Sequence, residues 1–406
     1  MSYLVLIITT LCFLPSMNLW ASHTGDERGV AVIPSEARNG EEPDTVHKSD
    51  VVVTASRLEQ TRAEAPILVT VTDSKVLTAV QAVSLSEGLS FQPGLRLETN
   101  CQNCGFTQVR LNGLQGPYTQ ILIDSRPIFS ALNGVYGLDQ IPAAMIDRIE
   151  VTRGGGSAMF GAGAIAGTIN ILTKEPDHNG FEVGGTMRVV GDTTLDLNAT
   201  ASASWVSPSM LTGVTAFGVV RDRGFYDHNG DNYSELVKLN GASGGIHAHH
   251  YITDDDRLSA QAHWIREFRR GGEMTDAKPE TTTITEQLDH AIVGGTLTYE
   301  RSMQNDAARL SAYASAQHTQ RASYYGGNGG DTAMTETAAK FYGNTDDLVL
   351  VGGVQYSETF ATSFHKDLVF VGGAELQYND VTDEMPGYER WIHQQTTNIG
   401  PYAQLQ

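Results

Sequence analysis

The chain has 406 residues, with 27 Lys and Arg against 47 Asp and Glu and a formal net charge of −20. This acidic surplus argues against a nucleic-acid partner, because contacts to phosphate groups need clustered basic side chains. The sequence contains no apolar run of the roughly 18 residues that a transmembrane helix needs. Helical membrane proteins, nucleic-acid binders and collagen-like fibres are therefore excluded, and the length suffices to bury a core.

The N-terminal residues have the pattern of an export signal. An apolar stretch runs from Leu4 to Leu14, and the small residue Ala21 follows shortly before polar residues begin. This pattern predicts a secretory signal peptide over residues 1–21, although no Lys or Arg precedes the apolar stretch. Residues 22–49 are polar and include an acidic run, so they are predicted to form a flexible tail.

Residues 50–176 have the mixed pattern of a compact α+β domain. Apolar residues spaced as on one helix face run from Leu77 to Leu89, with Ser84 as a candidate N-cap. Short runs rich in Val, Ile and Leu, bounded by polar residues and glycine, indicate strands. These predicted strands are 51–55, 67–71, 109–111, 120–124, 148–152 and 167–172.

From residue 177 onward the sequence predicts an N-terminal part of a transmembrane β-barrel, over 177–406. Apolar Leu195 and Leu197 alternate with polar Asp196 and Asn198, and this period of two recurs along the chain. Short turns alternate with long polar loops, as in outer-membrane barrels, and a soluble all-β domain is the alternative. About ten strands are predicted, at 181–191, 195–206, 210–221, 236–252, 257–268, 287–301, 308–321, 346–358, 366–379 and 396–406. The predicted long loops are 222–235, 269–286, 322–345 and 380–395.

Cys101 and Cys104 form a C-x-x-C pair. In an exported protein a disulfide between them is the expected state. A redox dithiol is one alternative, but that motif usually opens a helix, whereas the flanking Asn and Gly predict a loop. A zinc site is another alternative, although it would need a second ligand pair and the sequence has no second C-x-x-C.

The glycine-rich stretch from Gly154 to Gly167 includes Gly161-x-Gly163-x-x-Ala166, which matches a dinucleotide-binding fingerprint. That fingerprint directly follows a strand and opens a helix, whereas here a predicted strand comes after it. We therefore interpret these glycines as residues of tight turns and close packing. No nucleophile constellation is found either, so neither an enzyme nor a cofactor is predicted.

Three histidines lie on one predicted strand. His247 and His249 are expected to share a face, and His250 is expected to point the opposite way. We interpret them as solvated side chains facing the barrel interior, with a metal pair as the alternative.

Three segments within residues 50–176 carry a family resemblance. Gln108–Gly113, Ile121–Pro127 and above all Ile146–Lys174 are similar to the plug domain of TonB-dependent outer-membrane receptors. The stretch 50–55 resembles the TonB box of that family. The chain looks closest to the cobalamin and catecholate-siderophore receptors within it.

The resemblance implies energised import of a scarce metal chelate, such as a ferric siderophore or a cobalamin-like ligand. It implies TonB, with its ExbB–ExbD complex, as partner, and a monomeric barrel surrounded by outer-membrane lipid. A β-prone, unpaired segment beside a flexible tail suits capture by β-augmentation. The alternatives are an ordinary first strand at this segment and, for the whole chain, a passive porin, a receptor for haem or another substrate, or a secreted redox enzyme. The residues implied to bind TonB are Asp50, Val51, Val52, Val53, Thr54 and Ala55.

Ligand contacts are expected in two plug loops that face outward, Asn100–Phe106 and Phe129–Tyr136. Phe106, Phe129 and Tyr136 are the candidates to contact a chelate, because aromatic rings stack on flat ligands. Packing within the plug is the favoured interpretation for Phe129 and Tyr136.

The chain is expected to be part of a longer receptor. A globular plug over 50–176 has a diameter of roughly 36 Å. Ten strands would enclose about 20 Å, whereas the family's roughly twenty-two strands enclose about 44 Å. An incomplete barrel is therefore expected.

Overall fold

The computed structural model describes residues 52–53, 57–58, 60–61, 65, 68–127, 133–154, 159–328, 331–361 and 367–406. The predicted signal peptide and tail lie outside these residues. Among the described residues, no helix is long and apolar enough to cross a membrane.

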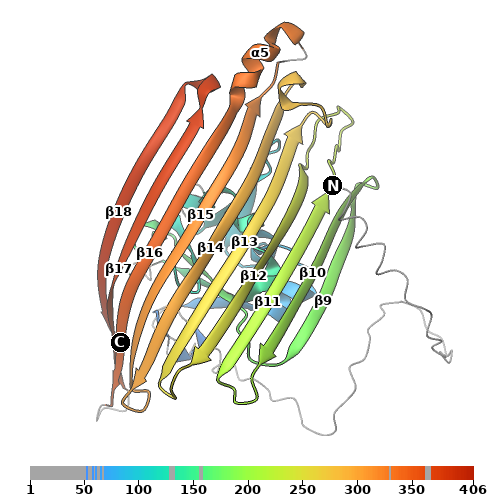
Figure 1. Cartoon of the computed structure of the whole chain (residues 1–406). Helices are drawn as coiled ribbons and strands as arrows, with labels where there is room; N and C mark the ends of the chain where they lie inside the picture. The colour runs from blue at the N-terminus through green and yellow to red at the C-terminus, as the bar shows by residue number, and fades with distance from the viewer. Residues whose placement is uncertain are drawn as a thin grey trace, which may run out of the picture. The chain divides into compact units, whose positions relative to one another are not determined.

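One antiparallel sheet of ten strands dominates the fold, and each strand pairs with its neighbour in chain order (Figure 1). All ten predicted strands are present. They are β9 (Gly180–Val190), β10 (Thr194–Val206), β11 (Thr212–Arg223), β12 (Lys238–Tyr251), β13 (Asp256–Gly272), β14 (Thr285–Met303), β15 (Ala308–Gly326), β16 (Tyr342–Phe360), β17 (Leu368–Met385) and β18 (Arg390–Leu405).

The sheet has one apolar and one polar face, as predicted. On β10, Leu195 and Leu197 are 49% and 41% exposed, whereas Asp196 and Asn198 on the other face are 6% and 8% exposed. The polar face is covered because the remainder of the described chain packs against it. We call this polar face the inner face.

Long connections gather at one end of the sheet, over residues 224–237, 273–284 and 327–341, and this end is called the long-loop end. They include the short helix α5 (Thr335–Ala338) and the 3₁₀ turns η5 (Pro279–Thr281), η6 (Thr332–Met334) and η7 (Ala339–Phe341). Short turns such as 252–255 and 304–307 lie at the opposite end, the short-turn end.

The prediction of a long loop at 380–395 is wrong. Strand β17 continues to Met385 and β18 begins at Arg390, so only a turn containing η8 (Pro386–Tyr388) connects them. The polar composition of this stretch suggests a loop. It instead belongs to a hydrogen-bonded ribbon that extends the two strands.

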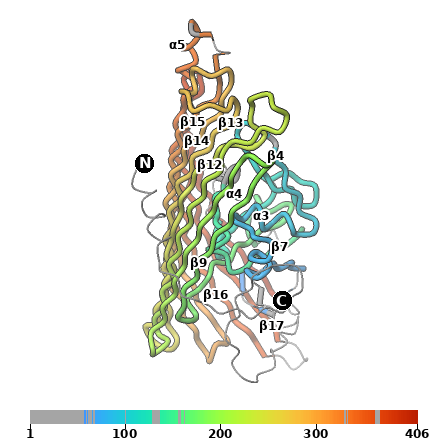
Figure 2. Tube along the Cα trace, turned by 90° about the vertical axis from the view of Figure 1, so that its right-hand side faces the viewer, coloured from blue at the N-terminus to red at the C-terminus, as the bar shows by residue number. Residues whose placement is uncertain are grey.

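The plug is built around a four-stranded sheet of order β3-β7-β8-β6, in which β6 and β8 are parallel and the other pairs are antiparallel. Figure 2 shows the plug elements gathered on one side of the ten-stranded sheet. The sheet strands are β3 (Val69–Asp73), β6 (Thr119–Ile123), β7 (Ile146–Arg153) and β8 (Gly167–Thr173). A hairpin of β4 (Leu95–Cys101) and β5 (Phe106–Leu111) lies beside it, with the turns η1 (Gly116–Tyr118), η2 (Ala143–Met145) and η4 (Ala162–Ala164).

Short helices complete the plug. The predicted helix from Leu77 to Leu89 is divided into α2 (Ser74–Ala79) and α3 (Leu85–Leu89), because Gln81 between them adopts a φ of +52°. Ser84 is the N-cap residue of α3, as predicted. A third helix, α4 (Asn133–Gln140), follows β6. Fully buried Leu85, Leu89, Ile149 and Ile171 belong to the apolar core of the plug.

Two glycines of the glycine-rich stretch, Gly163 and Gly167, pack tightly, as the sequence suggested, whereas Gly154 and Gly161 have open space around them. Gly167 opens β8 with a φ of +144°, and a Cβ placed on it would lie 2.1 Å from the Thr152 carbonyl oxygen and 2.7 Å from Leu111 Cδ2. Only the short turn η4 precedes this strand, and no helix follows the fingerprint. The local structure is therefore unlike a dinucleotide-binding turn.

Candidate functional site

The plug contacts the inner face of the ten-stranded sheet mainly through polar side chains. These contacts occur at the long-loop end, halfway along the strands and at the short-turn end. They define the candidate functional site, because any ligand or partner that moves the plug must alter them.

At the long-loop end, the loop between β4 and β5 lies against β13, β14 and Val237, which precedes β12. The Cys101 thiol donates a hydrogen bond to Glu286 at 3.3 Å, and Arg269 Nη1 donates one to the Gly105 carbonyl at 2.8 Å. Gly105 has a φ of +61°, and a Cβ there would lie 2.8 Å from Val237 Cγ2. Both its conformation and the space available therefore favour glycine.

The next group of contacts between the plug and the sheet is centred on Arg269. Its side chain is 2% exposed and pairs with Glu267 at 2.7 Å and with Asp139 of the plug at 3.2 Å. Gln140 donates a further hydrogen bond to Glu267 at 3.1 Å. We call the ten-stranded sheet the wall. The end of α4 is thus bound to the wall by a buried, fully paired arginine, and full pairing is what makes a buried charge tolerable.

A second ion-pair group joins α3 to the first strands of the wall. Glu87 pairs with Arg188 at 2.9 Å and with Arg221 at 3.3 Å, and Arg221 also pairs with Asp196 at 2.7 Å. One plug carboxylate therefore bridges two wall arginines on β9 and β11.

At the short-turn end, Arg57 forms an anchor between the N-terminal segment and the wall. Its guanidinium lies 3.1 Å from Glu375, with side-chain exposures of 3% and 14%. The guanidinium also lies over the rings of Phe160, at 5.0 Å, and Tyr402, at 4.5 Å. Gln355 donates to the Arg57 carbonyl at 2.7 Å. We call these contacts the Arg57 anchor.

Burial lowers the pKa of the Arg57 guanidinium, but the Glu375 carboxylate more than offsets this, so the net shift of its pKa is upward. The anchor is therefore a charged pair. By contrast, burial lowers the pKa of the neighbouring Arg126, which stacks on Tyr313 at 3.6 Å.

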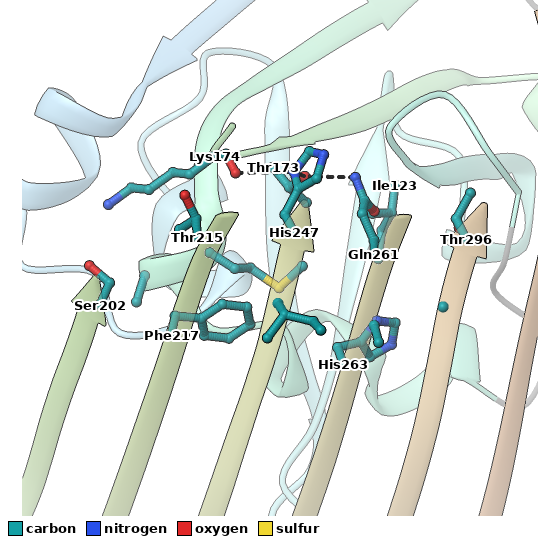
Figure 3. Close-up of a pocket in the computed structure, with 15 residues that line it drawn as sticks. Ile123, Thr173, Lys174, Ser202, Thr215, Phe217, His247, Gln261, His263 and Thr296 are labelled. Carbon is teal, nitrogen blue, oxygen red and sulfur yellow. Dashed lines mark hydrogen bonds between the residues drawn. The ribbon is translucent and has the colours of Figure 1, made fainter. Parts of the chain in front are cut away.

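Two of the cavities between the plug and the wall lie beside His247, and one of these also reaches the Arg57 anchor. A small one of about 30 Å³ is lined by side chains that include Phe217, His247 and His263 (Figure 3). At its edge, Gln261 donates to Thr173 at 3.1 Å, and a His247 ring nitrogen lies 3.2 Å from the Lys174 carbonyl oxygen.

The second cavity, of about 190 Å³, reaches the anchor and is lined mostly by polar and charged side chains, among them Arg57, Arg126, Glu175 and Glu300. Its lining suits water more than an apolar ligand.

The histidines are arranged as predicted. His247 and His249 face inward, 8% and 9% exposed, and His250 lies on the other face. His247 and His249 are buried rather than solvated, whereas His250 is exposed. Among the described residues they belong to neither of the two groups of His, Cys, Asp and Glu whose ligand atoms converge.

Of the predicted TonB-binding residues, only Val52 and Val53 lie within the described residues; Asp50, Val51, Thr54 and Ala55 do not. The two valines form β1 (Val52–Val53), which pairs with β2 (Gln60–Thr61). The expectation of an unpaired segment is therefore wrong for these two residues. TonB binding stays a prediction, and capture by a partner would require β1 to exchange its pairing strand.

The other predicted site residues have different outcomes. Cys101 and Cys104 are both free thiols, so the disulfide stays a prediction. Phe106 begins β5 and is half-buried, and Tyr136 lies in α4. Phe129 lies outside the described residues. Ligand binding by these three aromatic residues stays a prediction.

Sequence reasoning missed the partners that complete each contact. Arg57 follows the predicted box closely, but its partner Glu375 is 318 residues away in the sequence. Glu286 is likewise 185 residues from Cys101. The alternation along a predicted strand shows which of its charged residues face inward. This signal does not identify the partner of such a residue.

The domain family described as "TonB-dependent Receptor Plug Domain" matches residues 61–168. A curated relative, "Vitamin B12 transporter BtuB" of Vibrio vulnificus (strain CMCP6), is 36% identical over 127 residues. That match covers 31% of this chain and 21% of the relative, so the shared region spans about a fifth of the relative's length.

Solved structures resemble the whole described fold. The ferripyoverdine receptor of the outer membrane of Pseudomonas aeruginosa superposes with a TM-score of 0.68 at 14% identity, over 89% of this chain and 52% of that chain. The siderophore receptor PirA of the same organism gives 0.61 at 17% identity, over 84% and 53%. The ferric yersiniabactin uptake receptor FyuA of Yersinia pestis gives 0.55 at 13% identity, over 84% and 61%.

The chain spans about half the length of these structures, which agrees with ten strands of an incomplete barrel. The plug match and the BtuB relative support an outer-membrane location. Residues 61–168 match the plug domain of TonB-dependent receptors, and the plug together with the ten-stranded sheet has the fold of the receptor structures named above.

Proposed function

We propose that this chain is the N-terminal part of a receptor that imports a metal chelate across the outer membrane and is driven by TonB. The ligand would be a ferric siderophore or a cobalamin-like compound. The named relatives, a vitamin B12 transporter and siderophore receptors, support this ligand class. ExbB–ExbD would supply the energy through TonB. No chemical step occurs on the ligand.

The Arg57 anchor is the observation that carries the proposal. It lies four residues after Val53, within the segment that a periplasmic partner would pull. A pull on β1 therefore reaches Arg57 before it reaches β3, the first strand of the plug sheet. The anchor rests on a charge pair beside a polar cavity of about 190 Å³, so water can replace its contacts when it opens.

The contacts higher in the plug support the same mechanism. Glu87 and Asp139 bind wall arginines. The Glu87 pairs are partly exposed, so water can replace them, and Arg269 keeps its partner Glu267 when Asp139 leaves, so neither release leaves a buried charge without a partner. A continuous apolar interface would instead fix the plug permanently. The wall contacts are thus suited to a plug that shifts during each transport cycle.

Labelled-ligand uptake by cells that make the full-length receptor tests this function. Val52→Pro removes a backbone N–H and disfavours β-pairing, so it should abolish uptake of the ferric siderophore or cobalamin while surface binding survives. Val52→Thr keeps the N–H and a β-branched side chain, and it should transport at nearly the wild-type rate.

Uptake that is unchanged in Val52→Pro, or that persists when a protonophore removes the inner-membrane gradient, would contradict coupled transport. It would favour the passive porin instead. If both Val52→Pro and Val52→Thr bind the ligand but do not import it, the loss of uptake comes from changing the side chain at position 52 and not from loss of β-pairing.

A further inference from the structure

We propose that Cys101, Cys104 and Glu286 form a binding site for one thiophilic divalent cation of the Zn²⁺ type, which links the plug to the barrel wall. The two thiols belong to the loop between β4 and β5, and the carboxylate belongs to β14. The inference concerns the reduced thiols and does not depend on the proposed import function.

The three side chains converge. Their ligand atoms, the two Sγ atoms and one carboxylate oxygen, all lie within 4.8 Å of one another. A tetrahedral Zn²⁺ with ordinary bond lengths would place its two sulfur ligands about 3.8 Å apart and each sulfur about 3.5 Å from a carboxylate oxygen. The observed distance of 3.3 Å between Cys101 Sγ and Glu286 Oε2 fits such a site.

Backbone hydrogen bonds of the loop also hold the two sulfur ligands in place. The Cys104 N–H donates to Cys101 Sγ at 3.3 Å, and the Gly105 N–H donates to the Cys101 carbonyl at 3.0 Å. Such hydrogen bonds orient a ligand residue before a metal binds. Gly105, with its φ of +61°, turns the chain immediately after the second ligand.

The wall holds the loop in place from two further directions. Arg269 donates to the Gly105 carbonyl at 2.8 Å. On β13, a Cβ placed on Gly271 would lie 2.2 Å from the Asn103 carbonyl oxygen, so the loop backbone lies directly against that strand. The third ligand is therefore supplied on a fixed element. This answers the objection that a single C-x-x-C provides too few ligands.

The charge at the site favours a cation. A divalent cation would compensate two thiolates and a carboxylate that otherwise repel one another. Because the metal must displace thiol protons, its affinity should fall by about tenfold for each pH unit that the solution is made more acidic, for each proton displaced.

Two sulfur ligands and one oxygen ligand select a borderline or soft ion such as Zn²⁺ over Ca²⁺ or Mg²⁺, which prefer oxygen. Three protein ligands leave one coordination position for water or for a group from a ligand.

The test uses the full chain, purified with a thiol-sparing reductant, and Co²⁺ as a spectroscopic probe displaced by Zn²⁺. Wild-type protein should bind one Co²⁺ with a thiolate-to-metal absorption band. Cys101→Ser should remove that band, and Glu286→Gln should weaken Zn²⁺ binding by at least about tenfold. Asp289→Asn is the matched control, because Asp289 lies three residues further along β14 on the opposite face and pairs with Arg266. It should bind as wild type.

Thermal unfolding supplies a readout that does not depend on colour. Saturating Zn²⁺ should raise the unfolding midpoint of wild-type protein and of Asp289→Asn, and raise it less in Glu286→Gln. A Cys101–Cys104 disulfide that persists under reductant would overturn the proposal. So would Zn²⁺ affinity that is equal in wild type and Glu286→Gln, or a Co²⁺ spectrum without a thiolate band.

Discussion

Removing the carboxylate of the Arg57 anchor should release the N-terminal segment. Glu375→Gln keeps the size of the side chain but leaves the Arg57 guanidinium buried without its opposite charge. Tyr313 also donates to Glu375 and would retain an acceptor in the amide. The variant therefore removes the charge pair more than the packing.

The magnitude follows from the burial of the two groups. Breaking a fully buried ion pair costs about 3–5 kcal/mol. Glu375 is 14% exposed and the pair borders a polar cavity, so we reduce this to about 2–3 kcal/mol. At about 1.4 kcal/mol per factor of ten, the population with a released segment should rise by roughly 30- to 150-fold.

Limited trypsin digestion measures this population, because Arg57 is itself a cleavage site that is buried in the closed state. When opening and closing are fast, the cleavage rate follows the open population. Cleavage after Arg57 should therefore accelerate by the same factor in Glu375→Gln. The control is Glu358→Gln, since Glu358 accepts a hydrogen bond from Tyr356 on its own strand. Its cleavage rate should match wild type.

A rate in Glu375→Gln within threefold of wild type would refute the reasoning. It would mean that the cation–π contacts and the hydrogen bond from Gln355 hold the segment without the charge pair. Equal acceleration in both variants would show that any lost carboxylate loosens this end of the sheet, and the anchor would have no special role.

Two further predictions concern the plug and an outer loop. Gly167→Ala should destabilise the plug by roughly 2–4 kcal/mol, because the new Cβ would meet the Thr152 carbonyl oxygen at 2.1 Å. Faster hydrogen exchange in β8 measures this loss of stability. The control is Gly154→Ala, which should cost about 1 kcal/mol because no atom lies within 4 Å of the new Cβ. In loop 224–237, desolvation of the Asp227 carboxylate raises its pKa, but backbone N–H groups such as those of Gly230 and Asn232 lower it more, so its pKa is below the ordinary value. The order of this loop should therefore persist above the ordinary carboxyl pKa and be lost as pH falls through the lowered one. Proteolysis of the loop against pH checks this, and the dependence should flatten in Asp227→Asn.

Much of the fold could be predicted because the alternation of side chains is a local property. On β10 the residues from Leu195 to Trp205 show which face is apolar without any knowledge of the partner strand. The same rule failed at 380–395, because polar and apolar residues there do not alternate: Asp383 has the same parity as Val381, and Glu384 the same parity as Ile392. Alternation has no signal there, and composition alone suggested a loop.

The site could be predicted only in part, because its contacts are made across the interior of the barrel. The C-x-x-C pair was visible as a motif, but Glu286 reaches it through the register of β14 against the plug. Arg57 was visible as a charged residue after the predicted box, yet its burial depends on Phe160 and Tyr402, from two distant segments. Side-chain pairing between the plug and the wall is a tertiary property that one sequence does not encode locally.

The plug is held together and held in place by different forces. The plug itself is stabilised by an apolar core that includes Leu85, Ile149 and Ile171, and the burial of these side chains is lost only when the plug unfolds. Its contacts with the wall are mainly ion pairs and hydrogen bonds, apart from two apolar contacts. Phe217 packs against the plug core, and Leu122, Met159 and Phe160 cluster with Val371 near the anchor. A pull on the N-terminal segment should therefore open the two-residue β1–β2 pairing and the Arg57 anchor first, then the Phe160 contact, and leave the plug core folded until the remaining polar contacts yield.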